Sequence, residues 1–103
     1  MADPMRIRAQ MTGDRAKVRV LMAHEMETGL RKDGSGKVIP AWYIQHVDAK
    51  LNGKPVMTAQ WGPAVSKNPF LQFNVKGAKA GDKIAVTWTD NKGATRTDEA
   101  TVS

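Results

Sequence analysis

The sequence predicts one all-β domain over residues 1–103, an antiparallel immunoglobulin-like β-sandwich of about seven strands. Apolar and polar residues alternate with a period of two in seven segments, and turn signals rich in Gly, Asn, Asp or Pro separate them. No stretch of ten residues carries the apolar stripe of a helix. Seven short strands in about a hundred residues favour a sandwich over a helical or βαβ fold.

The first two expected strands, residues 5–11 and 16–24, form a hairpin around the turn at 12–14. Because apolar and polar residues alternate in both, the hairpin has one apolar and one basic face. The basic face carries Arg6, Arg8, Lys17 and Arg19. These cations either receive an acidic partner or, fully solvated, keep an edge strand from pairing with another chain.

A long connection rich in glycine and charge follows at residues 29–40 and ends at Pro40. Asn52-Gly53 favours a tight type I′ hairpin turn between the next two strands. Phe73 and Trp88 fall on apolar strand faces and are expected in the core, whereas Phe70 falls on the polar side of its strand. The remaining strands are expected at residues 41–51, 54–63, 70–75, 83–90 and 94–102.

Composition limits the classes of function. The absence of cysteine excludes thiol catalysis, disulfides and cysteine zinc sites for this chain acting alone. The net charge of +6 favours acidic partners. No nucleic-acid partner is expected, because no aromatic residues lie among the cations of the hairpin as stacking platforms. No membrane partner is expected either, because the chain has no export signal and no run near the roughly 18 apolar residues of a membrane span.

One short motif suggests a metal site. Met22, His24 and Met26 are two residues apart, so an extended strand would place them on one face. Thioether and imidazole ligands suit copper, with His46 or Glu25 completing the shell. In the alternative interpretation, Met22 belongs to the core and His24 bonds to backbone at a strand end.

Catalysis is not expected. Ser35, Ser66 and Ser103 lie in turn-like or terminal segments without a nucleophile motif. The adjacent aromatics Trp42 and Tyr43 must point to opposite sides of a strand, so at most one faces the core. The other, beside the end of the long connection, either forms an apolar patch typical of protein interfaces or is covered by that connection.

The run from His24 to Asp33, followed by Ile39-Pro40-Ala41 and Ile44, resembles the SoxZ family, the small subunit of the SoxYZ carrier complex of bacterial thiosulfate oxidation. Weaker similarities at the turns extend the resemblance over nearly the whole chain. The family commonly has proline where this chain has Glu25, a residue that leaves the backbone less restricted. The weaker similarities lie at Leu51-Asn52-Gly53, Asn68-Pro69, Ala80-Gly81-Asp82 and the following Trp-Thr-Asp strand.

This resemblance implies a non-catalytic subunit without metal or cofactor, and it favours a family loop over a copper site. It also implies a stable heterodimer with SoxY, whose cysteine on a C-terminal arm carries the sulfur intermediates, and contact with other Sox enzymes through that complex. The expected location is the periplasm, reached by export together with SoxY. The isolated chain is expected to self-associate through its uncovered partner surface. We expect this surface to contain His24, Met26, Thr28, Ile39, Trp42 and Tyr43.

Overall fold

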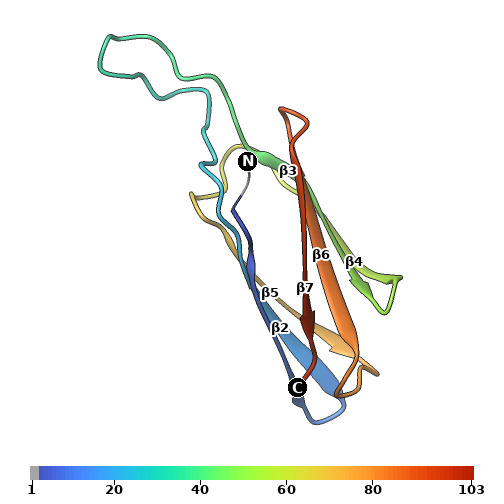
Figure 1. The fold of residues 1–103 in the computed structure, drawn as a ribbon. Helices are drawn as coiled ribbons and strands as arrows, with labels where there is room; N and C mark the ends of the chain where they lie inside the picture. The colour runs from blue at the N-terminus through green and yellow to red at the C-terminus, as the bar shows by residue number, and fades with distance from the viewer. Residues whose placement is uncertain (1–2) are drawn as a thin grey trace.

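The computed structural model describes residues 3–103 and contains seven antiparallel strands in two sheets (Figure 1). One sheet has the order β1-β2-β5 and the other β4-β3-β6-β7. The predicted all-β sandwich is confirmed. No helix in the described part of the chain is long and apolar enough to cross a membrane. The strands are β1 (Arg6–Thr12), β2 (Arg15–Leu21), β3 (Ile44–Leu51), β4 (Lys54–Gln60), β5 (Phe70–Lys76), β6 (Lys83–Asp90) and β7 (Thr95–Thr101).

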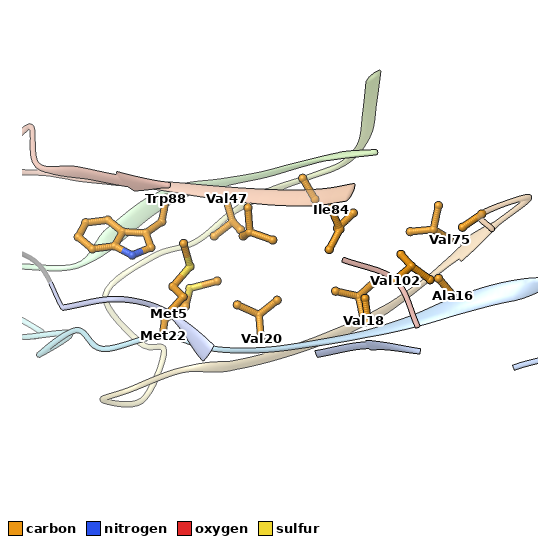
Figure 2. Close-up of a cluster of buried hydrophobic side chains, with 14 of the residues drawn as sticks. Met5, Ala16, Val18, Val20, Met22, Val47, Val75, Ile84, Trp88 and Val102 are labelled. Atoms are coloured by element: carbon orange, nitrogen blue, oxygen red, sulfur yellow. The ribbon is translucent and has the colours of Figure 1, made fainter. Parts of the chain in front are cut away.

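The core lies between the two sheets and follows from strand alternation. Val18 and Val20 of β2 are fully buried and point toward Val47 of β3 and Ile84 of β6 (Figure 2). Trp88 is also buried, as predicted, and Phe70 is 59% exposed on the polar side of β5. Phe73 is only half-buried, because it packs at the margin of the core.

Three strands are shorter at one end than the alternation predicts. β4 ends at Gln60 rather than at residue 63, and β2 and β3 are shortened for a common reason. β2 ends at Leu21 rather than at residue 24, because the following backbone bonds to another loop: the Met22 N–H donates to the Pro69 carbonyl at 3.0 Å. β3 begins at Ile44 rather than at residue 41, because the segment before it bonds to Glu27 and Asn91. The segments lost from β2 and β3 form one end of the sandwich.

Residues 29–40, here called the arm, extend beyond this end as a narrow antiparallel loop (Figure 1). The Ile39 N–H donates to the Arg31 carbonyl at 2.7 Å, and the Asp33 N–H donates to the Lys37 carbonyl at 2.8 Å. Leu30 is 86% exposed and Val38 is 54% exposed. The arm is therefore paired with itself and presents apolar side chains to solvent.

Candidate functional site

Asp90, the last residue of β6, organises the end of the sandwich from which the arm leaves. Its Oδ2 lies 3.0 Å from His24 Nε2 and accepts a hydrogen bond from Trp42 Nε1 at 2.8 Å. Its Oδ1 accepts from the backbone N–H groups of Lys92 at 3.0 Å and Ala94 at 2.9 Å. The carboxylate therefore joins the loop after β2, the segment before β3 and the β6–β7 turn. We call this group the Asp90 cluster.

The hydrogen bonds of His24 determine its tautomer. The Met26 backbone N–H donates to His24 Nδ1 at 3.1 Å, so Nδ1 carries no proton. Nε2 is therefore the protonated nitrogen and donates to Asp90. The ring lies 5.0 Å from that of Trp42 and makes an edge contact with that of Trp88 at 5.1 Å. The imidazole of His24 is held on both nitrogens and covered by two indoles.

The hydrogen bonds also determine the charge of Asp90. Burial alone would raise the pKa of its carboxyl group, but the bonds from His24, Trp42 and the turn backbone favour the ionised form and together lower the pKa below its ordinary value. The Lys92 ammonium lies 4.3 Å from the centroid of the Trp42 ring, which adds a cation–π contact at the exposed side. Asp90 is thus a buried carboxylate with a satisfied charge.

The base of the arm, residues 26–28 and 41–43, is attached to this cluster. Glu27 and Trp42 exchange two backbone hydrogen bonds, of 2.6 and 3.0 Å. The Asn91 side chain donates to the Ala41 carbonyl at 2.8 Å and accepts from the Tyr43 N–H at 2.9 Å. The Asn91 side chain therefore holds residues 41–43 directly, and residues 26–28 are held through the backbone bonds between Glu27 and Trp42.

The structure brings five residues of the expected partner surface to the arm and its base and places His24 in the loop just before the base, but it does not expose all six. Thr28 is exposed, and Ile39, Trp42 and Tyr43 are half-buried. The sequence places His24 and Met26 in that surface, whereas the structure buries both, at 6% and 5% exposure. The reason is that they take up the hydrogen bonds of the loop interior. Both side chains therefore face the interior of the loop.

The same contacts give the residues of the copper hypothesis other roles. Both ring nitrogens of His24 are engaged, Met22 is buried in the core, and Met26 Sδ accepts a hydrogen bond from the Ile44 N–H at 3.3 Å. His46 is exposed on β3, and Glu25 pairs with Lys67 at 3.3 Å. The alternative, a core methionine and a histidine bonded to backbone, is confirmed. Within residues 3–103, no group of three or more His, Cys, Asp or Glu could hold a metal ion.

Sequence reasoning missed Asp90, which reads as an ordinary turn residue before Asn91-Lys92-Gly93. The available signal was local: an Asp at a strand end often accepts hydrogen bonds from the backbone of the following turn. Its bonds to His24 and Trp42, 66 and 48 residues away, have no local signal.

A cleft of about 550 Å³ opens beside the Asp90 cluster. Trp42, Asn68 and Arg96 are among the residues that line it, together with Asp90 itself. Trp88 also borders the cleft; its Nε1–H is buried and has no hydrogen-bond partner within the described residues. The rigid cluster therefore has one face that opens to solvent.

Comparison with known families gives a match over nearly the whole chain. The profile described as Sulphur oxidation protein SoxZ matches residues 5–101, which include all seven strands, the arm and the Asp90 cluster. No curated protein matches the chain. Because the family match covers nearly the whole sequence, the chain belongs to the SoxZ family and has a role in sulfur oxidation.

Proposed function

We propose that this protein is the non-catalytic SoxZ subunit of a SoxYZ carrier complex. In this proposal it binds SoxY, which carries the sulfur intermediates on a cysteine of its C-terminal segment. The complex then presents this SoxY segment to the other Sox enzymes. Family membership supports a place in a complex of the Sox system. The chain contains no cysteine, so the thiol that carries sulfur must belong to a partner.

The observation that carries the proposal is an exposed apolar surface on the arm, continued at its base by two half-buried aromatic side chains. Leu30 and Val38 are more than half exposed, and the half-buried Trp42 and Tyr43 lie at the base. Apolar and aromatic side chains of this kind are enriched where proteins bind one another. We expect SoxY to cover them, and we expect the isolated chain to self-associate through them.

The Asp90 cluster supports the same proposal by making the base rigid. Its hydrogen bonds hold His24, Trp42 and the β6–β7 turn in one arrangement before any partner binds. A preorganised surface loses less conformational entropy on binding than a flexible one. In this proposal His24 and Met26 contribute to SoxY binding by holding the base of the arm in place, without direct contact to SoxY.

The side chains of His24 and Asp90 use their polar atoms in hydrogen bonds within the chain, which supports a non-catalytic role. A histidine that acts as a general base needs a free ring nitrogen near the proton it removes. His24 uses Nδ1 for the Met26 backbone and Nε2 for Asp90, and the carboxylate of Asp90 accepts four hydrogen bonds. We further propose a periplasmic location, reached by export together with SoxY.

Co-expression with SoxY from the same genome tests this proposal. Size exclusion and mass spectrometry should give a one-to-one complex that survives high salt. The double variant Leu30→Asp with Val38→Asp should weaken that complex about tenfold or more, because it places charge in an apolar contact. Val56→Asp, at another exposed apolar position on β4, is the matched control and should not weaken it.

Two results would count against the proposal in different ways. Elution of the chain apart from SoxY refutes the function itself. A complex that is unchanged by the arm variant, by Trp42→Ala and by Tyr43→Ala refutes only the surface. Trp42→Ala also removes a hydrogen bond to Asp90, so its folding must be checked by circular dichroism.

A further inference from the structure

The outward face of the three-stranded sheet is uniformly basic. Strands β1, β2 and β5 present twelve outward positions in four rows across the sheet, and none of them is acidic. Eleven of the twelve side chains are exposed, and Lys17 is half-buried. We call this surface the basic face. Its six cations are Arg6, Arg8, Arg15, Lys17, Arg19 and Lys76.

This face accounts for the charge of the whole protein. The ten Lys and Arg residues that lie elsewhere are matched in number by the ten acidic residues of the chain, so the net charge of +6 equals the charge of the basic face. Cations that look scattered along the sequence are gathered because β5 pairs with β2 and brings Lys76 opposite Arg15. The charge is therefore a local property of one surface.

Ordinary solvation of an edge strand does not explain this arrangement. Cations that prevent aggregation belong on edge strands, but Arg15, Lys17 and Arg19 lie on β2, the central strand of the sheet.

The strand register places cations opposite one another, which destabilises the sheet. Arg8 lies directly opposite Arg19, and Arg15 lies directly opposite Lys76. Arg15 has an ion-pair partner in Asp14 at 3.1 Å, whereas the other five cations have no acidic partner within residues 3–103. Their charge is open to an external partner.

One end of the basic face is apolar. Leu21 and Phe70 are directly opposite each other on β2 and β5 and are 42% and 59% exposed. Arg6 completes the same row on β1. A surface that combines one apolar contact with surrounding charge of a single sign is complementary to a folded protein whose acidic surface has an apolar spot.

We propose that the basic face is a docking surface for an acidic protein, separate from the surface proposed for SoxY. The cations provide steering and orientation, and the Leu21–Phe70 pair provides the apolar contact. The two surfaces adjoin at the Leu21–Phe70 row, because β2 ends at Leu21 on the side of the arm. The basic face nevertheless covers the strands of one sheet, whereas the arm extends beyond one end of the sandwich (Figure 1). The proposal therefore stands on its own if SoxY fails to bind.

Two other anionic partners fit the basic face less well. Nucleic-acid binding would require aromatic platforms among the cations, and Phe70 lies in the end row, away from most of them. A membrane would require apolar side chains that protrude into lipid, but Leu21 and Phe70 lie within strands, beside longer arginine side chains. Cations spread over three neighbouring strands favour a protein as the binding partner.

Charge reversal tests the proposal. The probe is a fluorescein-labelled peptide in which Asp and Glu alternate with Ser, and its binding to the full chain is measured by fluorescence anisotropy. The peptide should bind, and more weakly as salt rises. Arg8→Glu with Arg19→Glu should weaken binding about tenfold or more. Lys50→Glu with Lys54→Glu, on the other sheet, changes the net charge equally and should have less than about a twofold effect.

The same variants are then tested with vesicles of phosphatidylglycerol and with a single-stranded oligonucleotide. The chain could bind the vesicles or the oligonucleotide more tightly than the peptide and lose this binding in the Arg8 and Arg19 variant. That result would overturn the proposal in favour of lipid or nucleic acid. Absence of peptide binding, or an equal loss in both double variants, would also overturn it. If the SoxY complex still binds the peptide, the basic face is separate from the SoxY surface. If the complex no longer binds the peptide, the two surfaces are not separate.

Discussion

The Nε2–H of His24 donates to Oδ2 of Asp90 at 3.0 Å, between side chains that are 2% and 0% exposed and lie 66 residues apart in sequence. Because Nδ1 of the same ring accepts from the Met26 N–H, one imidazole connects the β6–β7 turn to the loop that enters the arm. A buried polar network that is fully satisfied selects a single arrangement of its elements. This bond therefore couples the end of the sandwich to the base of the arm.

Replacing Asp90 by Asn should destabilise the protein by about 2–4 kcal/mol, because an amide keeps one acceptor oxygen where the carboxylate offers two and places an NH₂ group against N–H donors. Urea unfolding measures the loss. Asp48→Asn is the control, since Asp48 is exposed and, within residues 3–103, its carboxylate accepts a side-chain hydrogen bond from Thr58 Oγ1 alone. Equal stability of the two variants would show that the buried carboxylate contributes nothing particular.

The contribution of Asp90 should depend on pH in one direction. Its pKa is lowered in the folded state, so its stabilising effect is fully present above the ordinary aspartate pKa of 3.8 and is lost as pH falls through the lower folded value. The difference in unfolding free energy between wild type and Asp90→Asn should narrow only below that pH. Asp98 also has a lowered pKa, because Arg96 bonds to its carboxylate. Its contribution to the pH dependence is the same in wild type and variant and cancels when their unfolding free energies are subtracted. A difference that narrows already between pH 7 and 5 would contradict the assignment.

Nitrogen-15 NMR should find the proton of neutral His24 on Nε2. The reason is that a backbone N–H can only donate, and the Met26 N–H occupies Nδ1. His46, exposed on β3, serves as the internal reference for an imidazole in solvent. A protonated Nδ1 would mean that the Met26 bond does not form and that the loop after β2 has another conformation.

Gly29→Ala should loosen the base of the arm. Gly29 has φ of +85°, and an added Cβ would lie 3.1 Å from the Cβ of Ala41 on the opposite segment. The strained backbone alone costs about 1–2 kcal/mol. Amide exchange of Glu27 and Trp42, which bond across the base, should become faster. Gly34→Ala, in the same arm with open space around it, is the control and should leave both amides unchanged.

Strand alternation was sufficient for the fold. The pattern of Val18, Val20 and Met22 on one side and Lys17 and Arg19 on the other predicts a buried and an exposed face, and the structure confirms both faces. At residues 22–24 and 41–43, two places where the pattern erred, the apolar spacing continued but the backbone bonded to loops instead of strands. Spacing indicates which side chains are buried, not which backbone groups pair.

The sequence by itself determined the sandwich, the buried faces of its strands and the family motifs at the arm. Only the tertiary structure decided what the residues of these motifs do. It buried His24 and Met26, joined His24 to Asp90, and placed Lys76 opposite Arg15 on a single basic face. The physical reason is range: alternation is a local property of each strand, whereas hydrogen bonds and charge patterns between distant segments arise only when the sheets assemble.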